Sequence, residues 1–364
     1  MKITIFDDIF DEREAWKVIH ELQDILVLSL CAILCGAEDY EAIEEYGKQK
    51  LDFLRQFLKL GGGIPSSSTI KRVFRYLDPS SLVDCLKKNV KQVLKLQEKY
   101  LLNIDGKVLR GTANKGKKKS GICILSAWAQ EANLVIGQVK AEAKSNEKTA
   151  IPKLLEDLDL ENAIVSIDAI ACNNPISTQI VEGGGDYILA VKKNKKGLYE
   201  EISDWLKRDR SDFGKYSQTD YVGGRIEEKS YIVCTNLEHI CQDDLLAKSK
   251  SIIKVISKRT TGEQTQEEIR YYISSIETSP EQFAKYIRGH WSIENQLHWH
   301  LDVSFNEDKS RVRKGNGAEN LTVMRKLALQ SLKKMTDKSS IKRRRLKAGW
   351  NNDYLFEILE TAFS

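Results

Sequence analysis

The sequence predicts an α/β protein with a helical N-terminal domain, and three features of its hydrophobic pattern support this. From about Glu12 to Glu98, apolar residues recur at intervals of three and four, as in amphipathic helices. From Leu101 onward, short apolar or alternating segments indicate strands, and a second group of strands without intervening helices occupies about 208–279. We therefore expect a helical domain at 1–98, a sheet-containing domain with a β-rich insertion at 99–335, and a basic C-terminal tail at 336–364.

The composition is that of a globular protein, with 41% hydrophobic and 30% charged residues in 364. The longest apolar run, at 25–37, is interrupted by Ser29 and is too short to cross a bilayer whose core is ~30 Å thick. Acids stand at Asp7 and Asp8, where a signal peptide would carry none. These features predict a cytoplasmic protein without a membrane partner.

The seven cysteines are scattered and mostly embedded in apolar segments, which predicts reduced core thiols. Cys31 and Cys35 stand four residues apart, but no second Cys/His pair follows at zinc-finger spacing. The pattern therefore does not favour a structural zinc site.

Positive charge is concentrated near the C-terminus. The segment 309–347 carries 14 Lys and Arg against two acids, a net charge of +12, so the remainder of this +5 chain carries −7. Such a concentration favours a polyanionic partner and suggests that the tail governs affinity for it. For 342–347 taken alone, a solvated basic tail without a specific target remains an alternative.

A turn divides the N-terminal helices. Gly61 to Pro65 break the helical pattern, and 66–69 offer Ser and Thr as helix caps before a short basic helix. This arrangement fits a helix-turn-helix DNA reader, and equally an ordinary turn between two helices.

The predicted elements of the second domain follow the order β-β-β-α-β-α-β. This is the order of a ribonuclease-H-like core, in which the first and fourth strands lie side by side at the centre of the sheet. Asp105 and Asp168 are then expected to end these two strands. The segments that define the order are 101–105, 122–129 and 134–141 for the first three strands, then 149–158, 163–168, 175–182 and 186–192.

Two aspartates at the ends of adjacent apolar strands need a cation or hydrogen bonds, because an unpaired buried carboxylate is costly. Such carboxylates can hold a pair of Mg²⁺ or Mn²⁺ ions. A metal pair of this kind catalyses phosphoryl transfer on nucleic acids. The predicted helix at 282–305 supplies a third acid, Glu294, beside an apolar stripe formed by Tyr286, Ile293, Leu297 and Leu301.

Glu294 competes with Asp302 for the role of third ligand. The two stand about two helical turns, or roughly 12 Å, apart, whereas the ions of a metal pair lie ~4 Å apart. We expect Glu294 to be the ligand, and Asp302 to orient His298 or a basic neighbour outside the ligand shell. His290, Glu294, His298 and Asp302 recur every four residues and could also hold zinc, but the strand aspartates favour Mg²⁺.

Several blocks of the chain resemble one family of bacterial proteins. The segment 288–295 reads RGHWSIEN, followed by LHW at 297–299, LDV at 301–303, NED at 306–308 and SRVRKGN at 310–316. Earlier blocks read AILCGA at 32–37, GIPS at 63–66, DGK at 105–107, SIDA at 166–169 and DYILAVK at 186–192. Together they closely resemble the ISAs family of insertion-sequence transposases, which includes the H-repeat-associated proteins of Rhs elements.

The resemblance implies a bacterial, nucleoid-associated DDE transposase whose triad is Asp105, Asp168 and Glu294. Its expected partner is double-stranded DNA, at the element ends and the target, on which it acts as a homo-oligomer. Its expected DNA contacts are Lys192, Arg225, Arg288, Arg311, Arg313 and Lys314. Trp291 and Trp299 are expected in the core rather than stacked on a base.

Two alternatives share these features. One is a nuclease, or a non-mobile H-repeat-associated protein, that retains the triad. The other is a DNA-binding protein without catalysis, which leaves three acids at these positions unexplained.

Overall fold

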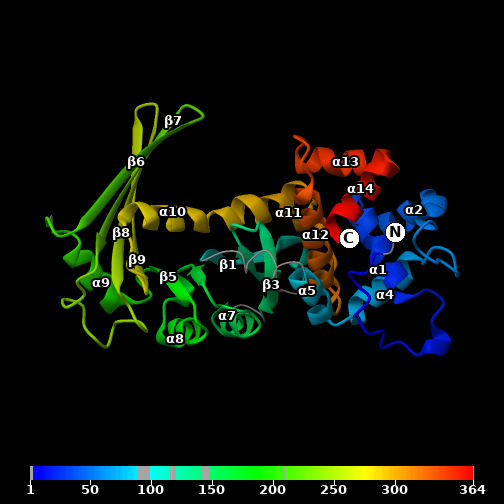
Figure 1. Cartoon of the computed structure of the whole chain (residues 1–364), viewed down its shortest axis with the longest axis horizontal. Helices are drawn as coiled ribbons and strands as arrows, with labels where there is room; N and C mark the ends of the chain where they lie inside the picture. Colours follow the sequence, from blue (N-terminus) through cyan, green and yellow to red (C-terminus); the bar gives the residue numbers. More distant parts are fainter. Residues whose placement is uncertain are drawn as a thin grey trace.

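The computed structural model describes residues 3–88, 99–114, 116, 120–141, 147–208 and 210–363. The molecule is elongated, with a helical region holding both termini at one end, a central sheet, and a four-stranded extension at the other end (Figure 1). In the described residues, no helix combines the length and apolar character needed to cross a membrane.

The N-terminal region is helical, as the periodicity predicts. The Ser66 side chain accepts a hydrogen bond from the Thr69 amide and begins α4, so the serine-rich segment acts as the predicted helix cap. Residues 89–98, the end of the predicted helical domain, lie outside the described residues. The elements are η1 (Ala15–Lys17), α1 (Leu22–Leu34), α2 (Tyr40–Gln49), α3 (Leu51–Leu54), α4 (Ser67–Tyr76) and α5 (Pro79–Lys87).

The segment 336–364 was expected to be a basic tail, but its residues 341–363 form two packed helices. These are α13 (Ile341–Trp350) and α14 (Asn352–Phe363), which share one hydrophobic core with α1, α4, α5 and the buried α12 (Gly317–Lys334). Arg345 is buried and donates from Nε and Nη2 to the Ile33 carbonyl, at 3.1 and 2.8 Å, and from Nη1 to the Ser304 carbonyl. A guanidinium here satisfies carbonyls at the C-terminal ends of two helices, which have no intrahelical donor.

The basic segment is therefore not uniformly available to a partner. Arg325, Lys326, Arg344 and Arg345 are all buried, whereas Lys342 and Arg343 are exposed. Sequence reasoning counted these charges together because a linear count does not show which cations point inward.

The sheet has nine strands in the order β3-β2-β1-β4-β5-β9-β8-β7-β6. β1 pairs in parallel with β4, and β4 with β5, which confirms the predicted adjacency of the first and fourth strands. The bounds are β1 (Tyr100–Leu109), β2 (Ile122–Ala129), β3 (Leu134–Ala141), β4 (Ala163–Ile167), β5 (Asp186–Val191), β6 (Gly214–Val222), β7 (Arg225–Cys234), β8 (Ser251–Thr261) and β9 (Gln264–Ser274).

The β-rich segment is an extension of the same sheet. β9 pairs antiparallel with β5, and β8, β7 and β6 follow outward, so hydrogen bonding is continuous from the core to the extension. The pattern did not predict β6, whose sequence GKYSQTDYV is mostly polar and partly exposed. It also did not predict α9 (Lys196–Trp205), which precedes the extension.

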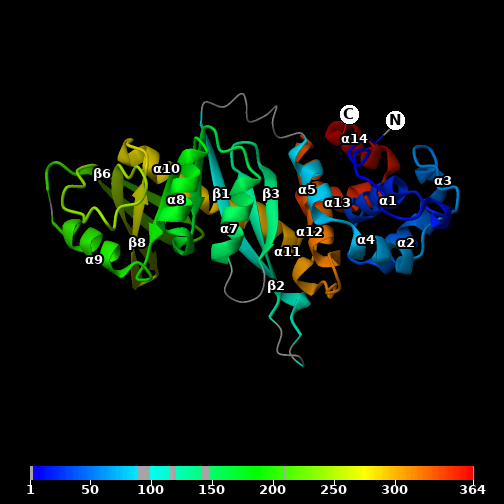
Figure 2. The ribbon, with the colours of Figure 1, turned by 90° about the horizontal axis from the view of Figure 1, so that it is seen from below.

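Helices cover both faces of the central sheet. α7 (Glu147–Glu156) and α8 (Asn174–Glu182) lie on one face, and α10 (Pro280–His290) crosses the other (Figures 1 and 2). Because successive side chains of a strand alternate between faces, the even-numbered residues of β1 from 100 to 104 belong to the core beneath α7 and α8. The odd-numbered residues from 101 to 107 face α10 and the helical segment that follows it.

We predict that Arg345→Met destabilises the protein by on the order of 3 kcal/mol, since the Ser304 carbonyl loses its guanidinium donor and the Ile33 carbonyl keeps only local bonds such as that from the Gly36 amide at 3.3 Å. Arg343→Met is the matched control on the same helix, and its exposed side chain should change stability by less than about 0.5 kcal/mol. Denaturant unfolding followed by circular dichroism measures both. Removal of all residues after Thr336 should lower the melting temperature as well. An unchanged melting temperature in Arg345→Met or in the truncated protein would contradict this description of the C-terminal helices.

Candidate active site

A helical segment runs along β1 and contacts it at three successive levels. Asn103 donates from Nδ2 to the Gly289 carbonyl, at 3.0 Å, and to Ser292 Oγ, at 3.2 Å. Two residues further along, Asp105 meets His298, and Lys107 then meets Asp302. Every second residue of β1 thus binds a later part of the helix, which fixes the position of the helix along the strand.

The close approach at the first level requires a glycine. A Cβ at Gly289 would lie 2.5 Å from Leu101 Cδ2 and 2.4 Å from Gln130 Oε1. This explains why glycine stands beside His290 in the RGHWSIEN segment.

Asp105, Glu294 and His298 converge at the second level. His298 Nδ1 lies 3.1 Å from Glu294 Oε2 and 3.4 Å from Asp105 Oδ2, and the ligand atoms of all three lie within 4.8 Å of one another. Asp105 was expected at a strand end, but it lies within β1 and pairs with Ser126 of β2. The strand continues past Asp105 because Lys107 and Leu109 still pair with Ile124 and Ile122 of β2.

The buried ring of His298 acts as a hydrogen-bond donor toward the carboxylates. Within the described part of the chain, its Nε2 is buried without a hydrogen-bond partner, so we infer that the ring proton lies on Nδ1. This hydrogen bond lowers the pKa of the Glu294 carboxyl, which is 58% exposed. His298 therefore holds Glu294 in its ionised form.

Asp168 follows β4 directly, as expected, and lines the same cleft as Asp105 and Glu294. It stands apart from the tight cluster of three: its side chain is 61% exposed, and Lys192 Nζ lies 3.5 Å from its carboxylate. The three acids thus come from β1, the end of β4 and the helix above them, and they share one cleft.

The helix is not regular where Glu294 lies. Residues Glu294–His298 form one π-helical turn between α10 and α11 (Trp299–Val303), where the sequence pattern predicted an uninterrupted helix. Such turns insert a residue into a helix and are frequent at functional sites. Ile293, Leu297 and Leu301 nevertheless remain buried, as their spacing predicts.

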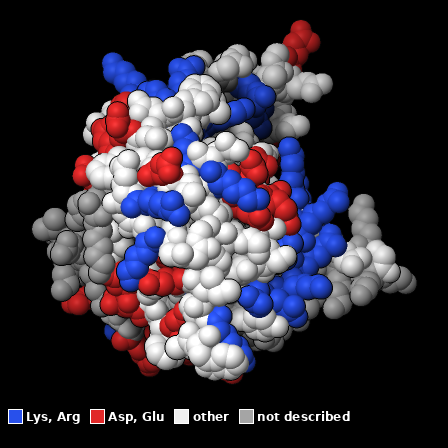
Figure 3. Space-filling model, turned by 90° about the vertical axis from the view of Figure 1, so that its right-hand side faces the viewer, with Lys and Arg blue, Asp and Glu red and all other residues white. Residues whose placement is uncertain are grey.

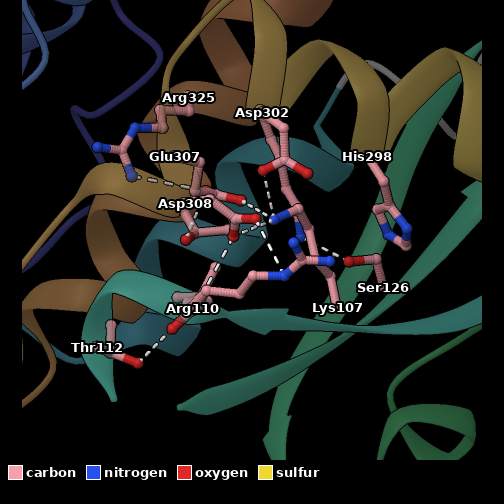
Figure 4. Close-up of polar contacts among 12 residues, drawn as sticks. Lys107, Arg110, Thr112, Ser126, His298, Asp302, Glu307, Asp308 and Arg325 are labelled. Atoms are coloured by element: carbon pink, nitrogen blue, oxygen red, sulfur yellow. Dashed lines mark hydrogen bonds and ion pairs between the residues drawn. The ribbon is translucent and has the colours of Figure 1, made fainter. Parts of the chain in front are cut away.

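Lys107 stands among three carboxylates at the third level (Figure 4). Its Nζ lies 2.7 Å from Asp302, 3.1 Å from Asp308 and 3.5 Å from Glu307. Burial tends to lower the pKa of Lys107, but these three acids outweigh it and raise the pKa above its usual value. Asp302 therefore pairs with a basic neighbour, one of the two roles expected for it, instead of with His298.

Sequence reasoning assigned no role to Lys107, although DGK places it two residues after Asp105 and hence on the same face of β1. It also assigned none to Glu307, which is buried between Lys107 and Arg325 and accepts from Thr322 Oγ1 at 2.9 Å. The alternation of β1 could have identified Lys107 as facing the helix.

His290 contacts the other central strand. Its Nδ1 lies 3.0 Å from Ser166 Oγ on β4, and burial lowers the pKa of its ring. Because Ser166 precedes Asp168 by two residues, this contact ties the helix to the strand that carries the second aspartate.

The basic residues expected to bind DNA fall into two groups. Lys192 lines the cleft, Arg288 pairs with Asp220 at 3.0 Å, and Arg225 lies at the β6–β7 turn. Arg311, Arg313 and Lys314 line a different groove, next to α4. The structure therefore does not bring all six side chains to one site.

Trp291 and Trp299 were expected in the core, but both are about half exposed. Trp291 lies at the cleft with the Arg270 guanidinium 5.0 Å from its ring centroid. Both tryptophans flank the buried apolar stripe. The helical periodicity did not distinguish residues at the edge of this stripe from those at its centre.

Comparison with known families accounts for nearly the whole chain. Residues 96–330 match the model described as "Transposase DDE domain", and residues 3–90 match the one described as "DDE_Tnp_1-associated". The chain belongs to the transposase DDE family.

Individual relatives of this DDE-family protein extend the match. It is 38% identical to "Putative transposase YncI" of Escherichia coli O157:H7, over 98% of this chain and 93% of the relative. It is 37% identical to "H repeat-associated putative transposase YhhI" of Escherichia coli K12, over 96% of this chain and 95% of the relative. A shorter match of 52% identity covers 17% of this chain and 75% of "Inactive transposase YbfQ" from the same strain.

We predict that Lys107→Met destabilises this DDE-family protein by about 3–5 kcal/mol, because it leaves three clustered carboxylates without their shared cation. Arg110→Met is the control, since Arg110 pairs with the same Asp308 at 3.4 Å from an exposed position and should contribute less than about 1 kcal/mol. Thermal and urea unfolding measure both variants. Equal stability of the two would show that the buried lysine is not needed to neutralise the cluster.

Proposed function

We propose that this protein is an active transposase that cuts and joins DNA strands at the ends of an insertion sequence, using Asp105, Asp168 and Glu294. The observation that carries the proposal is the shared cleft, to which three separate elements each contribute one acid. The transposase DDE family supports it, and so does the strand order, from which we infer a ribonuclease-H-like core.

The donor set suits a hard divalent cation. Asp105 and Glu294 offer carboxylate oxygens within 4.8 Å of each other, and Asp168 lies in the same cleft. These carboxylate oxygen ligands favour Mg²⁺ or Mn²⁺. We propose a pair of ions, which when bound would promote ionisation of the attacking hydroxyl and neutralise the leaving oxygen.

The protein's own side chains position the DNA and the acids. Lys192 and Arg270 line the cleft and supply positive charge for the phosphate groups. His298 orients Glu294, while Lys107 and Asp302 hold the helix against β1. We further propose that the helical domain expected at 1–98 contributes DNA binding and that the protein acts as a homo-oligomer.

Two other functions remain in competition with this proposal. A nuclease or non-mobile relative would keep metal-dependent cleavage and lack strand transfer, and the match to a relative named inactive makes this comparison relevant. A DNA-binding protein without catalysis would show neither reaction.

We expect Asp105→Asn, Asp168→Asn and Glu294→Gln each to abolish cleavage while leaving folding and DNA binding intact, since each removes one ligand charge. The assay is single-turnover cleavage of DNA carrying the sequences that flank the gene, at saturating Mn²⁺. Glu200→Gln is the control for the loss of one carboxylate charge, because Glu200 is an exposed acid of α9 outside the lining of the cleft, and it should cleave at the wild-type rate. Cleavage by a triad variant at the wild-type rate would remove that residue from the site.

His298→Ala and Asp302→Asn should cost only about 10–100-fold, as is typical of groups that support metal ligands. Full loss in Asp302→Asn with retained activity in Glu294→Gln would reverse the assignment of the third acid. Strand joining of a pre-cleaved end, measured in the same assay, separates a transposase from a nuclease.

A further inference from the structure

A second groove, distinct from the cleft of the acids, lies between α4 and the segment 306–317. Its lining carries seven cationic side chains against three acids, Glu38, Asp39 and Glu41. Lys and Arg gather on one side of the helical end of the molecule (Figure 3). The principal cations are Lys71, Arg72 and Arg75 on α4, and Lys309, Arg311 and Lys314 on the opposite wall.

The two walls are fixed to each other although they lie more than 200 residues apart in the sequence. The Asn316 amide donates to the Arg75 carbonyl at 3.0 Å, and Asn320 Nδ2 donates to the Phe74 carbonyl at 2.9 Å. Gly315 has a φ of +54°, and a Cβ there would lie 2.5 Å from the Arg75 carbonyl oxygen. The groove is therefore a built surface, and not a chance approach of two loops.

Most of its positive charge is uncompensated. Lys71 pairs with Glu41 at 3.1 Å, and Arg313 donates to the Gly111 carbonyl. Within the described ranges, Arg72, Lys309, Arg311 and Lys314 are exposed and have no ion-pair partner. Holding like charges together in this way opposes folding, and a polyanion relieves that repulsion.

The groove is joined to the element that carries Glu294. The segment 309–314 directly follows Glu307 and Asp308, whose carboxylates bind Lys107 on β1 together with that of Asp302. A nucleic acid held in the groove is thus held relative to the acidic cleft through Lys107.

We propose that this groove binds the phosphate backbone of a DNA duplex, with α4 of the helical domain and the 309–314 segment contacting it jointly. The inference rests on the proposed function for its choice of DNA as the polyanion. It assigns phosphate contacts to Lys71, Arg72 and Arg75, which belong to the short basic helix that the sequence offered as a possible DNA reader. Duplex DNA fits because its closely spaced phosphates match a row of exposed cations on two walls.

The test compares two pairs of substitutions in the full chain. Arg72→Gln with Arg311→Gln removes one cation from each wall, and Lys342→Gln with Arg343→Gln removes two exposed cations from α13 as the control. Fluorescence anisotropy with a labelled 30-base-pair duplex of arbitrary sequence gives the affinity at several salt concentrations.

We expect the groove pair to weaken binding on the order of 10- to 100-fold at low salt and to reduce the slope of log K against log salt by about 2. The control pair should keep the wild-type slope. An unchanged slope in the groove pair, or an equal reduction in both pairs, would overturn the proposal. Lys309→Gln with Lys314→Gln repeats the test on one wall if the first pair does not fold.

Two further measurements separate the groove from the catalytic proposal. If the groove pair lowers the slope but the wild-type protein cleaves no DNA, the groove stands and catalysis fails. If the wild-type protein cleaves DNA and the groove pair binds normally, the groove fails alone. A larger loss on a 30-nucleotide single strand than on the duplex would contradict duplex binding.

Discussion

The contact between β1 and the helical segment above it determines where the acids of the cleft meet. Asn103, Asp105 and Lys107 project from one face of the strand at intervals of about 6.6 Å, and each meets a later part of the helix. Hydrogen bonding at the first level and ion pairing at the third leave the helix no freedom to slide. Glu294 is consequently held opposite Asp105, although 189 residues separate them in the sequence.

The contact between β1 and the helical segment depends on a balance of charge. Acids near β1 repel one another, and Lys107 offsets this by binding three carboxylates from a buried position. Arg325 binds Glu307 from the other side. This neutralised cluster lies beside the cleft, and the proposed cation site of Asp105 and Glu294 is separate from it.

The sequence predicted the features that depend on local pattern. Strand order and the position of Asp168 followed from apolar runs that end in polar residues, and pairing of β1 with β4 followed from that order. Features set by tertiary contact could not be predicted in this way. The burial of Arg345 depends on carbonyls of distant helices, the π-helical turn at Glu294 depends on packing against β1, and the polar strand β6 forms because β7 is beside it.

The most direct test of the shared acidic site is an anomalous difference map from crystals soaked in Mn²⁺. We expect density in the cleft within coordination distance of Asp105, Asp168 and Glu294, with His298 outside the ligand shell. Density held by Asp105, Glu294 and His298 Nδ1, with Asp168 remote from every ion, would contradict it.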